Sequence, residues 1–438
     1  MNASPQATSV SQVSSPGQAL SKSQAAFLRR QNFAAVLGSE TIDDWQFDWN
    51  LLENPDISFS DPRKATLMSQ LHRRLKRISL MPNQSEDFRT LHFDFFNLRN
   101  RISGIHAERL EASARQYFAK RFPNAVAIHF LPKLAGVQMG GVACVTLPDN
   151  KPLKYFLKTH SSGRLSSNSS AAKPIDPREL LVYKALEYMG VGCETHFFHR
   201  SIEDVFIATL NAGHADGSSF STFQRATGIR ATCGDATYGE TIWGSIHSQL
   251  IHHKDCCEIE ENIRSDPIAQ NFLLQMTSLD MISRIFRLHD LLNNTENFGF
   301  CTSPTALPSL KVLDFRLMDD SNMMVASAHF SGFISGNSIF RYSSSHATLQ
   351  YVFRRRLEME RVKTALHLLT EGSLCRSHDF IQNAYEDVRL FFETFRSSDC
   401  DVEELTRIFV DLDDFREALH HNLNFFTSEL KSFSSSSL

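Results

Sequence analysis

The spacing of apolar residues changes near residue 125, and this change most limits how the chain can fold. Before it, apolar side chains recur at helical spacing, as at Leu67, Leu71, Leu75 and Ile78. After it come short β-like runs at 126–131, 141–147, 153–159 and 205–210. From residue 268 helical patterns return, apart from a β-like patch near 310–331. The order predicts an α+β protein whose β-rich part precedes an α-rich part.

Local signals refine this outline. Residues 177–189 are predicted to form one helix among the strands, with Asp176 as N-cap and Pro177 at the first helical position. Residues 216–245 are polar and rich in Gly and Thr, which indicates a loop. A helix is expected at 272–288, and amphipathic helices are expected at 350–370, 378–396, 402–409 and 412–430.

These patterns divide the chain into six expected segments. They are a disordered tail at 1–24, a helical N-terminal extension at 25–124, a β-rich lobe at 125–213, a lobe with catalytic and metal loops at 214–335, a helical part at 336–432, and a tail at 433–438.

Composition limits the function classes. The chain has 438 residues and a net charge of −4, which argues against general nucleic-acid binding. Its eight cysteines form no CxxC pair, so a reducing compartment is expected. No apolar run reaches the ~18 residues of a membrane span, and the N-terminus lacks the apolar core of a signal peptide. We therefore expect a cytoplasmic protein without a membrane span. The His and Cys residues at 247–257 lack the ligand spacing of a structural zinc site.

A lysine and a glutamate carry the first chemical signal. Lys158 ends a predicted strand, and Glu179 lies early in the helix that follows. A strand lysine facing a helix glutamate is the pair that anchors nucleotide phosphates in kinases, because the amine neutralises phosphate charge and the carboxylate fixes the amine. Lys154 and Glu187 are the competing candidates. Lys158 is preferred because its sequence context is more apolar.

Two neighbouring segments would complete a nucleotide site. Gly136, Gly140 and Gly141 lie in the hairpin before the Lys158 strand, where they could cover phosphates. Backbone groups near Thr209–Ala212, including Asn211, lie at the end of the last predicted strand of the β-rich part and would contact the adenine.

A polar loop and a later strand carry the second signal. The stretch RLHDLLNNTENFGF, residues 287–300, holds two acids and three asparagines among apolar residues. Asp314 follows in KVLDFR, at the end of an apolar strand. Asp314 is predicted to bind Mg²⁺ with the help of Asn297, and an acid of the loop, Asp290 or Glu296, is predicted to act as base.

With these motifs the chain resembles atypical protein-kinase-like folds over roughly 126–320. The residues that carry the resemblance are ELLVYKALEYMGV at 179–191 and LLNNTENFGF at 291–300. The most similar family is the actin-fragmin kinase catalytic domain, with the phosphoinositide 3/4-kinases and bacterial HipA-type kinases as more distant relatives. The resemblance implies a two-lobed kinase fold, ATP and Mg²⁺ as cofactors, and phosphate transfer to a protein hydroxyl, with a cytoskeletal substrate implied by the family. The apolar spacing adds helical extensions at both ends of that fold.

The loop departs from the family pattern in both possible alignments. In one, Glu296 replaces the catalytic Asp, and its longer side chain misplaces the carboxylate by roughly 1 Å, an error that can cost ~100-fold in rate. In the other, Asp290 is the base, but Thr295 stands where the metal-binding Asn belongs, between Asn294 and Asn297. Arg316 also replaces the glycine expected after Asp-Phe. Two functions stay open: an active kinase, and a catalytically weak pseudokinase that acts as a protein-interaction scaffold.

Overall fold

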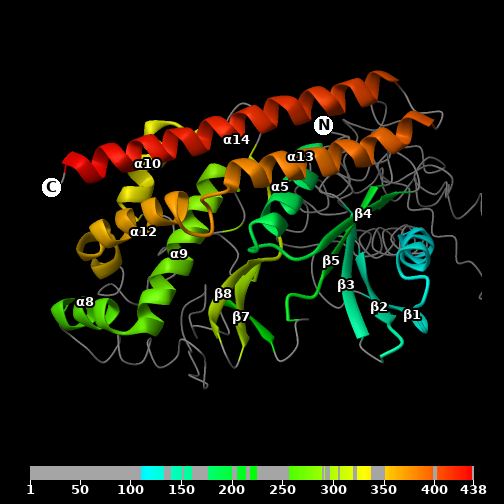
Figure 1. Ribbon diagram of the computed structural model, residues 1–438, viewed down its shortest axis with the longest axis horizontal. Coiled ribbons are helices and arrows are strands. Elements are labelled where there is room, and N and C mark those ends of the chain that lie inside the picture. Colours follow the sequence, from blue (N-terminus) through cyan, green and yellow to red (C-terminus); the bar gives the residue numbers. More distant parts are fainter. Residues whose placement is uncertain are drawn as a thin grey trace, which may run out of the picture.

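The computed structural model describes thirteen parts of the chain: residues 110–132, 140–149, 152–159, 176–199, 205–213, 218–223, 256–288, 291, 296–303, 306–318, 323–336, 351–397 and 402–436. Helices and two antiparallel sheets combine with a helical C-terminal region (Figure 1). This confirms the expected mixture of α and β structure. The tail at 1–24, most of the N-terminal extension, Gly136 and Asp290 lie outside the described residues.

The larger sheet has five antiparallel strands in the order β1-β2-β3-β5-β4. Their bounds are β1 Ala127–Pro132, β2 Gly140–Thr146, β3 Pro152–Thr159, β4 Thr195–His199 and β5 Val205–Leu210. Four of the five were predicted to within a residue at each end. Strand β4 was not predicted, because four of its five residues are buried and the run shows no alternation.

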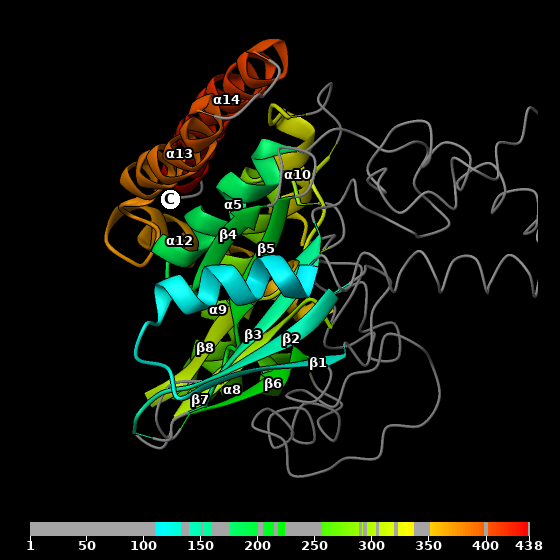
Figure 2. The ribbon, with the colours of Figure 1, turned by 90° about the vertical axis from the view of Figure 1, so that its right-hand side faces the viewer.

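Helices cover both faces of this sheet. Residues 110–121 are helical and pack across one face (Figure 2), where Phe118 meets Tyr155 with ring centroids 4.8 Å apart. Phe206 and Ala208 of β5 face this helix, whereas Val205 and Ile207 belong to the opposite core. That opposite core contains α5, Pro177–Tyr188. The Asp176 side chain caps α5 by accepting a hydrogen bond from Arg178 N at 3.1 Å, as the sequence predicts.

The smaller sheet has three antiparallel strands in the order β6-β7-β8. They span Ser219–Thr222, Phe298–Ser303 and Ala306–Val312. The first strand corrects the prediction of a loop over 216–245, because residues 219–222 pair with β7. Their polar side chains gave no strand signal in the sequence.

Three helices lie next to these strands in the sequence. They are α8 at Cys256–Ser265, α9 at Pro267–Ile285 and α10 at Ser327–Ile334. Helix α9 begins earlier than the predicted 272–288 because Asp266 caps it, accepting a hydrogen bond from Ile268 N at 2.9 Å. A β-like patch was predicted near 310–331, but its end is helical, because α10 begins at Ser327.

The C-terminal region is helical. It contains a π-helix η5 at Val352–Arg356, α12 at Glu358–Thr370, α13 at Ser377–Glu393, a 3₁₀ turn η6 at Thr394–Ser397 and α14 at Val402–Ser436. Helix α13 packs between α5 and α14 (Figure 1). The two helices predicted at 402–409 and 412–430 are one helix, which also continues through Ser436, where a tail was expected. Within the described residues, no helix is long and apolar enough to cross a membrane.

Candidate functional site

Lys158 lies on the inner side of β3. It pairs with Gly140 of β2 and Ile207 of β5 in the sheet register, and its side chain is buried on the face that packs against α5. Lys154, the competing candidate on the same strand, is exposed. A buried ammonium needs charged or polar partners, and Lys158 finds three.

The first partner is Glu179, in the first turn of α5. Its Oε1 lies 3.8 Å from Lys158 Nζ, and both side chains are buried. Glu187, the other candidate, lies two turns further along α5. Its carboxylate accepts hydrogen bonds from Thr195 N at 3.0 Å and Lys184 Nζ at 2.8 Å. Glu187 therefore fixes the start of β4, and Glu179 is the helix acid that faces Lys158.

The second partner is Asp314, which follows β8. Lys158 Nζ donates to Asp314 Oδ1 at 2.7 Å, Phe315 N donates to the same oxygen at 3.0 Å, and the Tyr183 hydroxyl donates to it at 3.1 Å. No donor among the described residues bonds the second oxygen, Oδ2. The Asp314 side chain is 46% exposed. The carboxylate is thus oriented through Oδ1, and Oδ2 has no hydrogen-bond donor among the described residues.

The electrostatics favour an ionised Asp314. Desolvation by burial acts to raise the pKa of this carboxyl group. The Lys158 ammonium and the hydrogen bonds from Lys158, Phe315 and Tyr183 outweigh desolvation and hold the pKa below its ordinary value. Asp314 is therefore an anion at neutral pH.

The third partner of Lys158 is Tyr183, which was not predicted as a site residue. Its hydroxyl accepts a hydrogen bond from Lys158 and donates one to Asp314. Burial, and then the charges of Asp314 and Glu179, raise the pKa of Tyr183 well above its ordinary value, so the phenol keeps its proton. Tyr183 follows Glu179 by four residues, so both share one face of α5. That spacing was the available signal, but a tyrosine within LLVYKAL is typical of core.

The polar loop also reaches Asp314. The backbone carbonyl of Asn297 accepts hydrogen bonds from Leu313 N at 2.7 Å and Asp314 N at 3.2 Å, which places Asn297 beside the acid. Asn297 is buried, whereas Glu296 is exposed. Asp290 lies outside the described residues, so the choice between Asp290 and Glu296 as base stays a prediction.

The start of the same loop is joined to the segment after Asp314. Leu288 forms a β-bridge with Leu317, and Met318 N donates to Arg287 O at 3.1 Å. Arg287 has a φ of 56°, a left-handed conformation that non-glycine residues rarely adopt. Such outliers persist where surrounding contacts fix them, and here these contacts join the start of the loop to the segment that follows Asp314.

The residues predicted to contact phosphates and adenine lie in or next to the larger sheet. Gly140 and Gly141 lie on β2 directly beside Lys158 and Leu157. At the expected adenine position, Leu210 N donates to Glu194 O and Asn211 N donates to Lys154 O, each at 2.8 Å. The Thr209 backbone lies in register with both β3 and β4. The N–H groups of Leu210 and Asn211 are therefore engaged within the protein, and adenine contacts from the backbone near Thr209–Ala212 stay a prediction.

Cysteine and histidine show no metal cluster where the structure describes the chain. No three His, Cys, Asp or Glu residues there lie close enough to hold an ion. Cys256 and Cys257 open α8 without a disulfide, and residues 247–255 of the same His/Cys stretch lie outside the described residues.

Comparisons with known proteins find similar solved structures, two of which are kinases. No protein-family model matches the chain, and no curated protein matches it. A crystal structure of a Helicobacter pylori proinflammatory kinase, CtkA, is similar at 8% identity and a TM-score of 0.29, covering 67% of this chain and 95% of that one. A crystal structure of the Golgi casein kinase is similar at 11% identity and a TM-score of 0.26, covering 96% and 94%. At TM-scores this low the likeness carries no argument, so the function is inferred from the geometry around Lys158 and Asp314.

Proposed function

We propose that this chain is a protein-kinase-like phosphotransferase that uses ATP and Mg²⁺ to phosphorylate a protein hydroxyl. One observation carries the proposal. Asp314 is oriented through Oδ1 by three donors, and one of these is Lys158, which also faces Glu179. A lysine, a helix acid and a carboxylate with an open oxygen are the parts that phosphoryl transfer requires around a metal-bound triphosphate.

Each side chain has a role in this proposal. Lys158 would neutralise phosphate charge, and Glu179 would hold Lys158 in place. Mg²⁺ prefers oxygen ligands and is usually held by one or two carboxylates with water and substrate phosphates. Oδ2 of Asp314 fits that requirement, and the adjacent Asn297 would assist it. Glu296 or Asp290 would orient the acceptor hydroxyl.

The arrangement of the elements supports a two-lobed fold. The five-stranded sheet with α5 would form one lobe over 125–213, and β7, β8 and α9 would belong to a second lobe over 214–335. Lys158 and Asp314 would then face each other across the junction. The resemblance of the sequence to the actin-fragmin kinase family favours a cytoskeletal protein as substrate.

A pseudokinase scaffold is the second candidate, and two observations favour it. Lys158 and Asp314 bond directly to each other, so a bound nucleotide would have to separate them. The N–H groups of Leu210 and Asn211 are engaged within the sheet, which removes donors that an adenine would use.

Nucleotide binding tests the proposal directly. The melting temperature of the full chain would be measured with ATP, with and without Mg²⁺, for the wild type, Lys158→Ala, Asp314→Asn and Lys154→Ala. Ligand at ~100 times its dissociation constant adds about 2.7 kcal/mol of stability. We expect a Mg²⁺-dependent rise in melting temperature that is lost in Lys158→Ala and Asp314→Asn. Lys154→Ala is the matched control, because Lys154 lies exposed on the same strand, and it should keep the rise.

The outcomes separate the two candidates. A wild type that shows no rise would contradict nucleotide binding and favour the scaffold. A rise without transfer of the γ-phosphate of ATP to acceptor proteins would favour a nucleotide-binding pseudokinase. Transfer that disappears in Asp314→Asn would support the active kinase.

A further inference from the structure

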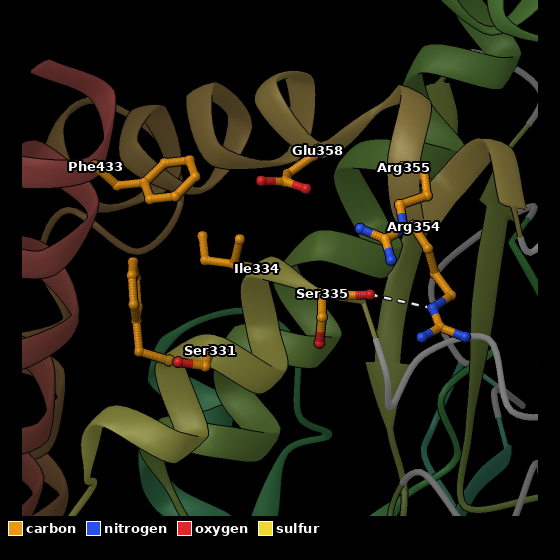
Figure 3. A pocket seen from close by; sticks show the side chains of 8 residues that line it. Ser331, Ile334, Ser335, Arg354, Arg355, Glu358 and Phe433 are labelled. Atoms are coloured by element: carbon orange, nitrogen blue, oxygen red, sulfur yellow. Dashed lines mark hydrogen bonds between the residues drawn. The ribbon is translucent and has the colours of Figure 1, made fainter. Parts of the chain in front are cut away.

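A cavity lies between α10, the π-helix η5 with the start of α12, and the end of α14 (Figure 3). Its volume of about 370 Å³ is in the range of small-molecule sites. None of the elements that line it supplies Lys158, Glu179 or Asp314, so it is separate from the proposed nucleotide site. Its walls include Phe330, Ile334, Arg354, Arg355, Glu358 and Phe433.

The cavity has an apolar side and a charged side. Phe330, Ile334 and Phe433 supply aromatic and aliphatic surface, and the rings of Phe330 and Phe433 meet edge to face with centroids 6.4 Å apart. Figure 3 shows Phe433 at one side and Arg355 at the other, with the Glu358 carboxylate between them. A ligand that spans the cavity would therefore meet apolar groups at one end and both signs of charge at the other.

The charged side is built by an unusual backbone. Arg354 and Arg355 belong to η5, and Glu358 begins α12 directly after it. Short π-helical segments are rare and often occur at functional sites, because they change which side chains share a helix face. Here the π-helix supplies two guanidinium groups to the cavity, and the first residue of α12 supplies one carboxylate.

Buried hydrogen bonds fix the walls relative to each other. Arg361 of α12 is fully buried and donates to Phe333 O at 2.7 Å and Ile334 O at 2.5 Å, at the C-terminal end of α10. Arg354 Nε donates to Ser335 O at 3.2 Å. Gly336 adopts a φ of 62°, and a Cβ there would lie 3.2 Å from both Arg354 Cγ and Arg361 Nη2. The end of α10 is therefore held closely against η5 and α12, so the cavity is a preformed one.

We propose that this cavity binds a free α-amino acid with an apolar side chain. The ammonium would pair with Glu358, the carboxylate would pair with Arg355 in the positive field of Arg354, and the side chain would pack on Phe330, Ile334 and Phe433. Arg is suited to the carboxylate because its planar guanidinium bonds both oxygens. A ligand with only one charge would leave Arg355 or Glu358 without its partner.

Matched probes test the chemistry. Calorimetric titration of the full chain would compare L-phenylalanine and L-leucine with 3-phenylpropionate, which lacks the ammonium, and 2-phenylethylamine, which lacks the carboxylate. We expect saturable binding of at least one amino acid, and about tenfold weaker binding of each analogue of phenylalanine, since a hydrogen bond to a charged group contributes about that much. Binding of neither amino acid, or equal binding of either analogue, would overturn the proposal.

Two variants assign the charges. In Arg355→Gln, 2-phenylethylamine should bind as well as L-phenylalanine. In Glu358→Gln, 3-phenylpropionate should bind as well as L-phenylalanine. Lys363→Gln is the control, because Lys363 lies exposed on α12 and does not line the cavity. This variant should bind L-phenylalanine more tightly than either analogue, as the wild type should. Variants that melt as the wild type does but keep that order would refute the assignment.

Discussion

The ammonium of Lys158 lies 2.7 Å from Oδ1 of Asp314, although 156 residues separate them in the sequence. This contact joins β3 of the larger sheet to the segment that follows β8 of the smaller one. Tyr183 of α5 completes it, with its ring 4.4 Å from Lys158 Nζ and 4.5 Å from the ring of Phe315. The Tyr183 side chain therefore contacts Lys158, Asp314 and Phe315.

Removing the Tyr183 hydroxyl should loosen this junction. Tyr183→Phe keeps the ring packing but removes a donor to Asp314 and an acceptor for Lys158, so we expect the free energy of unfolding to fall by about 1–3 kcal/mol. Urea unfolding at neutral pH would measure it. Tyr188→Phe is the control, because Tyr188 OH donates to Asp387 on the exposed surface, and it should cost less than about 1 kcal/mol. Equal losses of unfolding free energy in the two variants would show that the Tyr183 hydroxyl stabilises the protein no more than a surface hydroxyl does.

Asn422 holds α14 to the helix that leads into the polar loop. Its buried amide donates to Ile285 O and Met323 O, each at 2.9 Å, and accepts from Val325 N at 2.8 Å. Asn422→Ala leaves three buried backbone groups unpaired, so we expect a loss of about 3 kcal/mol or more in unfolding free energy. Asn424→Ala, on the exposed side of α14, should stay within about 0.5 kcal/mol of the wild type. Chemical denaturation of both variants would show the difference, and a loss below about 1 kcal/mol in Asn422→Ala would contradict the role of this network.

Periodicity predicted the elements that position the site, but not every partner within it. The strand ending at Lys158 and the helix beginning at Pro177 have clear patterns, and Asp176 and Pro177 mark the helix start. Tyr183 was missed because a tyrosine between apolar residues is typical of a core position, and only the fold shows where its hydroxyl points. The engaged N–H groups of Leu210 and Asn211 depend on strand pairing across the sheet, which local sequence does not encode.

The C-terminal helix shows a related limit of local patterns. Two helices were expected at 402–409 and 412–430, and the acids Asp411, Asp413 and Asp414 lie at or beside the expected break. In the structure they serve as surface partners of a continuous helix, because Asp411 accepts from Arg407 at 2.5 Å and Asp413 accepts from Tyr385 of α13 at 2.7 Å. Leu412 between them is fully buried. Tertiary contacts therefore accompany one continuous helix through the expected break.

Gly299 of β7 should tolerate no side chain. A Cβ there would overlap the carbonyl oxygen of Ser221 and lie 2.7 Å from the Cα of Thr222, so β6 would have to move. We expect Gly299→Ala to lower the unfolding free energy by about 1–3 kcal/mol, as overpacking does. Gly141→Ala in β2 is the matched control, because its Cβ would meet only Leu131 O at 3.4 Å. Thermal melts of the two variants should differ clearly, and equal melting temperatures would show that β6 adjusts without cost.

Two stacked histidines should make the packing of α13 on α14 sensitive to pH. His378 and His420 lie with their Nδ1 atoms 2.7 Å apart and their rings 7° from parallel. Burial, and then the nearby His378 and Arg416, lower the pKa of His420 below its ordinary value of 6.5. The contribution of His420 to stability is therefore complete above pH 6.5. It is lost as pH falls below that value, because the unfolded chain takes up the proton first. Between about pH 7.5 and 5.5, the urea midpoint of the wild type should fall more than that of His420→Gln. His421→Gln, on the exposed side of the same helix, should show the same fall in urea midpoint as the wild type. Identical falls in all three proteins would refute the role of His420.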